Sequence, residues 1–175
     1  MVARDLSEWC DVDALPAPGI DGCGLPNWPI PLGSLALGFA RFAKAAKGAD
    51  PAVTAIARAM QRHPSLVAGE HRLCTEVMRV MPDVLAKTGA EGVYVAAILD
   101  RGLGIALKVH DGATRASRLA IVKVLEALDC IADDKAKRSL GRELRPILKN
   151  FAGTPVGHIQ LSEETLDELH ARLDA

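Results

Sequence analysis

The sequence predicts an α+β fold in which an antiparallel β-sheet packs with several helices. Apolar residues recur at helical spacing between residues 32 and 80, and again after residue 114. Three short β-type runs lie between these two regions. Glycine-containing turns separate the runs, which favours a hairpin or meander over a parallel sheet. Helices followed by strands and then helices again indicate the α+β class, and 175 residues suffice for one domain with a sizeable core.

The composition is that of an ordinary soluble protein. Hydrophobic residues make up 49%, charged residues 25%, and the net charge is −1. This charge gives no electrostatic reason to expect nucleic acid or an acidic membrane as partner, and 3% aromatics argue against a platform for stacking bases. No window approaches the roughly 18 apolar residues of a membrane span. The start has no signal-peptide layout, so we expect a cytoplasmic protein without membrane contact.

The elements follow in order. Residues 1–31 are rich in Pro, Gly and Asp, and the prolines from position 16 onward prevent a continuous helix, so we expect an irregular segment. A helix is predicted over residues 32–47, with Gly48 as its end. Asp50-Pro51 predicts an N-cap followed by proline at the first helical position, opening a helix to about Arg62. Another short helix is expected over residues 70–80.

The β-type runs cover residues 84–87, 93–99 and 104–109. Residues 114–132 then predict a long amphipathic helix, and Asp133 predicts the cap of the next one. One more strand is expected within residues 151–160, where Pro155 suggests an edge position. Ser162 opens a last helix. The expected organisation is therefore an irregular segment (1–31), an α+β core (32–161) and a terminal helix (162–175).

The loop Asp21-Gly22-Cys23-Gly24 is the first candidate site. It is either a tight turn with a buried thiol or a site loop in which glycines free the backbone while an acid and a thiol project nearby. A thiol there could ligate zinc or act as a nucleophile, but one Cys and one Asp do not complete a zinc site. Because the four cysteines form no C-x-x-C pair, we expect reduced thiols rather than disulfides.

Lys87 is the second candidate. It begins Lys87-Thr88-Gly89, and a Lys-Thr-Gly strand is a device of serine acyl enzymes whose site resembles that of penicillin-binding proteins. The lysine either ends a strand at the surface or points into a cleft where its proton is useful in catalysis. Glu91 is most simply a turn carboxylate, although it is close enough in sequence to pair with Lys87.

Taken together, several motifs resemble the asparaginase II family, the thermolabile rhizobial-type L-asparaginases, over roughly residues 18–130. The resemblance implies a fold similar to part of the serine β-lactamases and glutaminases, and hydrolysis of L-asparagine to aspartate and ammonia. It implies a site role for Lys87 and Asp21 and a zinc-ligand role for Cys23, in a zinc site that assists substrate binding. The motifs are Gly19-Ile20-Asp21-Gly22-Cys23-Gly24-Leu25-Pro26, Met60 to Gly69 around His63-Pro64, Lys87-Thr88-Gly89-Ala90-Glu91-Gly92, and Asp100 to Gly112.

The chain departs from the family in one respect. Family members carry a Ser-x-x-Lys nucleophile and further zinc ligands in an amino-terminal half, and no Ser-x-x-Lys occurs in this sequence. We therefore expect a truncated L-asparaginase module, inactive alone, that a complementing amino-terminal half completes. The alternative is a non-catalytic remnant or interaction module that associates with itself or a partner through uncovered apolar surface. A zinc-binding thiol protein built on Cys23 is the third interpretation.

Overall fold

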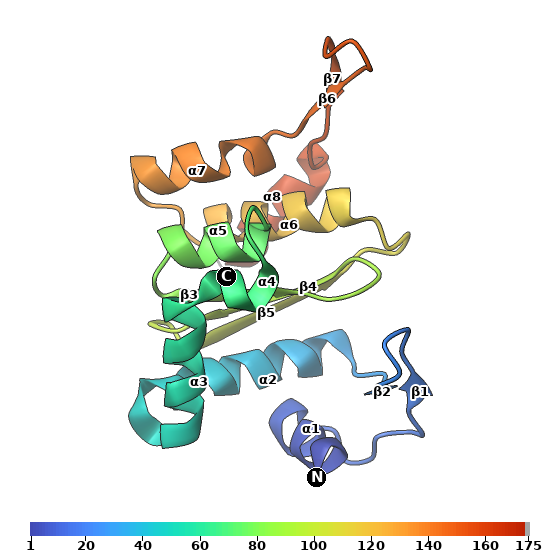
Figure 1. The fold of residues 1–175 in the computed structure, drawn as a ribbon, viewed down its shortest axis with the longest axis vertical. Helices are drawn as coiled ribbons and strands as arrows, with labels where there is room; N and C mark the ends of the chain where they lie inside the picture. The colour runs from blue at the N-terminus through green and yellow to red at the C-terminus, as the bar shows by residue number, and fades with distance from the viewer. Residues whose placement is uncertain (174–175) are drawn as a thin grey trace.

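A three-stranded antiparallel sheet forms the centre of the molecule in the computed structural model, which describes residues 1–173 (Figure 1). The sheet follows chain order, with β3 (Val84–Thr88), β4 (Val93–Ile98) and β5 (Leu103–Lys108) side by side. The three expected strands and their meander are thus confirmed, as is the α+β class. Among the described residues no helix has both the length and the apolar character required to cross a lipid bilayer.

One face of the sheet is covered by α2 (Leu32–Lys44), which contacts β5 and β4. Gly104 of β5 allows this close approach. A Cβ atom there would lie 2.0 Å from the carbonyl oxygen of Ala36 and 2.4 Å from the amide nitrogen of Ala40. The helix continues through a wide turn, η1 (Ala45–Ala49), in which Gly48 has a φ of 110°.

The other face is covered by α5 (Leu73–Val80) and α6 (Thr114–Ala127), with α7 (Asp134–Leu144) packed against both helices. The buried core lies between these helices and the sheet and consists mostly of aliphatic side chains and alanines. Helix α6 ends at Ala127, before the expected residue 132, because Leu128 is its C-cap and Asp129 adopts a φ of 55° that an α-helix does not allow.

Two shorter elements border the sheet. The expected cap is present at the start of α3 (Pro51–Arg62), where the Asp50 carboxylate accepts hydrogen bonds from the amides of Ala52 and Val53. His63 ends this helix, and Pro64 at once opens the five-residue α4 (Pro64–Ala68), which sequence analysis did not predict. Proline is tolerated at that first position because its missing N–H has no helical partner there.

The expectation of an irregular segment over residues 1–31 was wrong in part. A helix, α1 (Val2–Cys10), precedes the first proline at position 16 and packs on α2. The prolines therefore exclude a helix only in the second half of the segment. There the chain forms a short hairpin of β1 (Gly19–Ile20) and β2 (Pro26–Asn27), with the Asp-Gly-Cys-Gly loop at its tip.

The strand expected near Val156 exists but does not join the central sheet. It is β7 (Pro155–His158), which pairs with β6 (Ile147–Lys149) in a separate hairpin that projects from the body at the top of Figure 1. The terminal helix is α8 (Glu163–Leu173). The last two residues of the predicted segment 162–175 lie outside the described residues.

Candidate functional site

Lys87 lies near the end of β3, paired across the sheet with Val95. Its side chain is exposed, and its ammonium donates a hydrogen bond to the carbonyl oxygen of Thr88 at 2.7 Å. No ion pair within residues 1–173 involves it, and Glu91 in particular does not pair with it. In this chain the lysine is therefore a surface group with a free positive charge.

The pleat of the sheet places Lys87 on the face that α2 covers. Directly paired residues of neighbouring strands project to the same face, and so do alternate residues of one strand. Gly104, which contacts α2, pairs with Ala97, and Ala97 pairs with Leu85, two residues before Lys87. Lys87 therefore projects to the α2 face, whereas Thr88 projects to the opposite one.

Lys87 also lies at the amino-terminal end of α2. Gly102, just before β5, lies close to Lys44 near the end of α2. Gly104 of β5 lies close to Ala36 and Ala40, which are nearer the start of α2. Lys87 pairs with Val95, and Val95 pairs with Ala106, which is two residues beyond Gly104 along β5. Lys87 therefore lies further towards the start of α2. The segment that enters α2 at this end carries the β1–β2 hairpin (Figure 1).

The turn that follows Lys87 requires its glycines. Gly92 has a φ of 70°, and a Cβ there would meet Val109 at 2.9 Å. Glu91 precedes it with a φ of 51° and lies against Gly112, where a Cβ would come within 2.6 Å of the carboxylate. The Gly-Ala-Glu-Gly motif thus packs the β3–β4 turn against the loop after β5, and Glu91 serves as a turn residue.

Asp21 and Cys23 are brought together at the tip of the β1–β2 hairpin. The thiol lies 3.8 Å from one carboxylate oxygen of Asp21, whose other oxygen accepts a hydrogen bond from the Gly22 amide at 2.6 Å. Both side chains are exposed, so the thiol is not the buried one of the tight-turn alternative. Lys87 lies on the same face and at the same end of the sheet, but among the described residues no hydrogen bond or ion pair joins it to the hairpin tip.

This pair of donors does not make a zinc site by itself. Zinc in proteins is held by at least three protein ligands, and here one thiol and one carboxylate adjoin each other. Among the described residues, no group of three or more His, Cys, Asp or Glu side chains could hold a metal ion. Further ligands would have to come from elsewhere, so no chemical step is assigned to a metal.

A buried polar cluster of Cys74 and Tyr94 adjoins Thr88 and was not predicted from the sequence. The Cys74 thiol of α5 accepts a hydrogen bond from the Thr88 amide at 3.2 Å and lies 2.9 Å from the Tyr94 hydroxyl. Burial, followed by the neighbouring Cys74, raises the pKa of Tyr94 above its ordinary value. Cys74 falls in the helix expected over residues 70–80 and Tyr94 in the strand expected over residues 93–99. Helical and alternating patterns alone do not reveal that the two meet.

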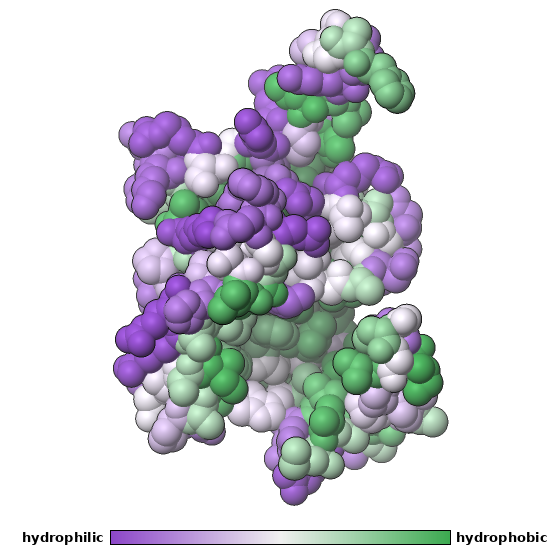
Figure 2. Space-filling view, in the orientation of Figure 1, coloured by the Kyte–Doolittle hydropathy of each residue, from purple (hydrophilic) through white to green (hydrophobic). Residues whose placement is uncertain are grey.

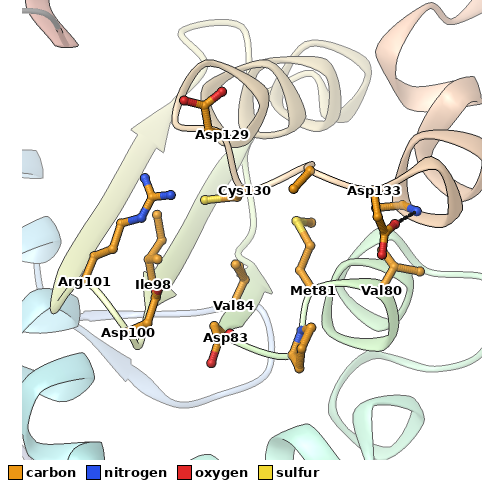
Figure 3. A pocket seen from close by; sticks show the side chains of 13 residues that line it. Val80, Met81, Asp83, Val84, Ile98, Asp100, Arg101, Asp129, Cys130 and Asp133 are labelled. Atoms are coloured by element: carbon orange, nitrogen blue, oxygen red, sulfur yellow. Dashed lines mark hydrogen bonds between the residues drawn. The ribbon is translucent and has the colours of Figure 1, made fainter.

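A cavity of about 250 Å³ lies at the end of the sheet opposite to Lys87, where β3 begins (Figure 3). Four aspartates and Arg101 surround it, among the mainly apolar residues of the neighbouring elements. Arg101 donates to the carbonyl oxygen of Leu128 at 2.5 Å, and Asp133 accepts from the Ala136 amide at 2.6 Å as the cap of α7. Both side chains therefore have structural roles, and none of the candidate residues lines this cavity.

Apolar residues gather around the hairpin that carries Asp21 and Cys23. Figure 2 shows hydrophobic surface over the lower part of the molecule, including this hairpin at the lower right, whereas the region of α5 and α7 is mainly hydrophilic. Exposed residues of the hairpin and of the start of α2 include Ile20, Leu25 and Leu32. Exposed apolar surface of this kind is typical of regions that another polypeptide covers.

The model of the L-asparaginase II family matches residues 1–161, which include the hairpin, α2 and the whole sheet. No curated protein matches the chain.

Proposed function

Because the chain belongs to the L-asparaginase II family, we propose that it supplies part of a site that hydrolyses the side-chain amide of L-asparagine. In this proposal Lys87 and Asp21 act on the substrate or its nucleophile. The nucleophilic serine comes from a Ser-x-x-Lys segment outside these 175 residues. The family match, which covers the Lys-Thr-Gly strand and the Asp-Gly-Cys-Gly hairpin together, is the observation that carries the proposal.

The chemistry of amide hydrolysis assigns Lys87 its role. A serine Oγ attacks the carboxamide carbon, and a base takes the serine proton and passes it to the amide nitrogen, which leaves as ammonia when the C–N bond breaks. Water then hydrolyses the ester to release aspartate. A positive charge close to the serine favours its alkoxide and stabilises the negative oxygen that develops on the substrate. Lys87 suits this role because its ammonium is exposed and has no carboxylate partner among the described residues.

The proposal extends to Asp21 and Cys23. A carboxylate beside the site can bind the α-amino group of the amino-acid substrate, and the thiol is a ligand type that zinc prefers. Their adjacency, 3.8 Å between the thiol and the carboxylate, and their place on the face and at the end of the sheet where Lys87 lies support this assignment. Zinc, if bound, would hold and polarise the substrate there.

Ammonia release from L-asparagine tests the proposal. The chain is mixed with a polypeptide that carries the Ser-x-x-Lys half of a family member, and each component is also assayed alone. We expect activity only in the mixture and a loss of at least about a hundredfold in Lys87→Ala. Lys108→Ala is the matched control, because Lys108 ends β5 and its ammonium likewise bonds only the next carbonyl oxygen. Absence of activity in the mixture, or full activity in Lys87→Ala, would reject the proposal.

A second candidate function is a non-catalytic interaction module. The projecting β6–β7 hairpin favours it, because every residue of both strands is exposed and a two-stranded hairpin has little stability of its own. Its apolar side chains, among them Ile147 and Val156, would be covered in an assembly. Analytical ultracentrifugation tests this function: a protein that stays monomeric at high concentration would contradict it.

A further inference from the structure

A second, smaller cavity lies on the far side of β3 from Lys87. Its volume is about 80 Å³, several times the roughly 10–15 Å³ that one water requires. The first turns of α5 and α6, Thr88 at the end of β3 and Tyr94 of β4 surround it. No carboxylate is among its lining residues, so the walls present mostly hydrogen-bond donors.

The buried pair at the base of the cavity has one donor too many. Cys74 and Tyr94 are each 1% exposed and share a single hydrogen bond of 2.9 Å. Two hydrogens, S–H and O–H, are available for this bond. The thiol sulfur already accepts from the Thr88 amide, and within residues 1–173 neither group has another acceptor. With the Tyr94 hydroxyl donating to the sulfur, the hydrogen left over is the S–H of Cys74, a weak donor that a ligand in the cavity can accept from.

Two arginines, Arg72 and Arg118, are among the residues that line the same cavity. The guanidinium of Arg72 is exposed and makes no hydrogen bond or ion pair with any described residue, so it is free to reach a ligand there. That of Arg118 binds Glu143 through Nε at 2.9 Å and Nη2 at 2.5 Å, which raises its pKa and leaves Nη1 free. Glu143 therefore offsets one of the two positive charges, and the cavity keeps the charge of Arg72.

Backbone amides at the starts of two helices add further hydrogen-bond donors and partial positive charge. Both α5 and α6 begin at this end of the sheet, and no side chain caps either amino terminus. The amides of Cys74 and Thr75 in α5 have no acceptor within the described part of the chain. Uncapped first turns carry partial positive charge, which adds to that of Arg72.

From this excess of donors and positive charge we propose that the cavity binds the carboxylate group of a small acid. A carboxylate matches the planar fork of Arg72 and supplies acceptors for the leftover hydrogen of the Cys74–Tyr94 pair. The cavity adjoins Thr88, the residue after Lys87. Since the cavity lies on the opposite face of the sheet from Lys87, its occupant is a small acid separate from a substrate held at Lys87.

NMR titration of the ¹⁵N-labelled chain tests the site, with acetate, L-aspartate, L-asparagine and inorganic phosphate as separate probes. The amides of Cys74 and Thr88 report binding directly. We expect saturable shifts with the carboxylates, weaker binding of phosphate, and at least about a tenfold loss of affinity in Arg72→Gln. Arg79→Gln is the matched control, because it removes the same charge from α5, the helix that Arg72 precedes, and Arg79 does not line the cavity but pairs with Glu70 at 2.9 Å.

Each outcome decides the matter. Absence of saturable shifts, equal affinity in Arg72→Gln, or phosphate binding as tight as the carboxylates would overturn the carboxylate site. Lys87→Ala should leave the titration unchanged, since Lys87 projects to the other face. A failed ammonia assay therefore does not bear on this cavity.

Discussion

Replacing Gly104 by alanine tests the packing that places Lys87 at the start of α2. The new Cβ would lie 2.0 Å from the Ala36 carbonyl oxygen and 2.4 Å from the Ala40 amide nitrogen. Real Cβ contacts are not shorter than about 3 Å, so α2 must retreat by roughly an ångström along its contact with β5. Such backbone displacement costs about 1–3 kcal/mol and sometimes more, so we expect a loss of about 3 kcal/mol in the free energy of unfolding.

Urea denaturation followed by circular dichroism measures this loss. Since domains of this kind are stable by about 5–15 kcal/mol, the midpoint should fall clearly at unchanged slope. Gly33→Ala is the matched control: it lies in the first turn of α2, and no atom is within 4 Å of its added Cβ. We expect that variant to keep or slightly raise stability. A loss below about 1 kcal/mol in Gly104→Ala would refute the close packing of α2 on the sheet.

Three further predictions concern a cap, an ionisation and a metal ligand. Asp50→Ala should lower the free energy of unfolding by about 0.5–2 kcal/mol, because two amides of α3 lose their acceptor; unchanged urea stability would contradict this. Burial raises the pKa of Tyr94, so its contribution to stability is complete below about pH 10 and declines at higher pH, as the unfolded phenol ionises. Tyr94→Phe should flatten that alkaline decline in urea titrations, and an equal decline in both proteins would be the contrary result. Zinc should bind the chain weakly and lose this binding in Cys23→Ser, as measured by competition with a metal indicator; tight binding unaffected by the substitution would show that the ligands lie elsewhere.

Most elements of the fold follow from local signals in the sequence. The Asp50-Pro51 cap, the glycine turns between the strands and the periodicity of α6 each depend on neighbouring residues, and the structure has all three. The misses depend on tertiary contacts or very short elements. The packing of α1 on α2 stabilises a helix that composition did not suggest, and β6 pairs with β7 over only a few residues.

The candidate site was predictable as motifs but not as geometry. The sequence identifies Lys87 and the Asp21–Cys23 loop because glycines and prolines mark their turns. Which sheet face each residue occupies depends on strand register, and therefore on the long-range pairing of Lys87 with Val95. The Cys74–Tyr94 contact joins a helix to a strand 20 residues away, and no local pattern records it.

The proposed amidohydrolase site requires the hairpin tip and the end of β3 to lie together. Cross-linking tests this directly, with a short reagent that joins a thiol to an amine, followed by mass spectrometry of the native chain. Cys23 is the one fully exposed cysteine among the described residues, so the reagent attaches there first. We predict a dominant Cys23–Lys87 link that disappears in Lys87→Arg. Links from Cys23 to other lysines, with none to Lys87, would contradict the shared site.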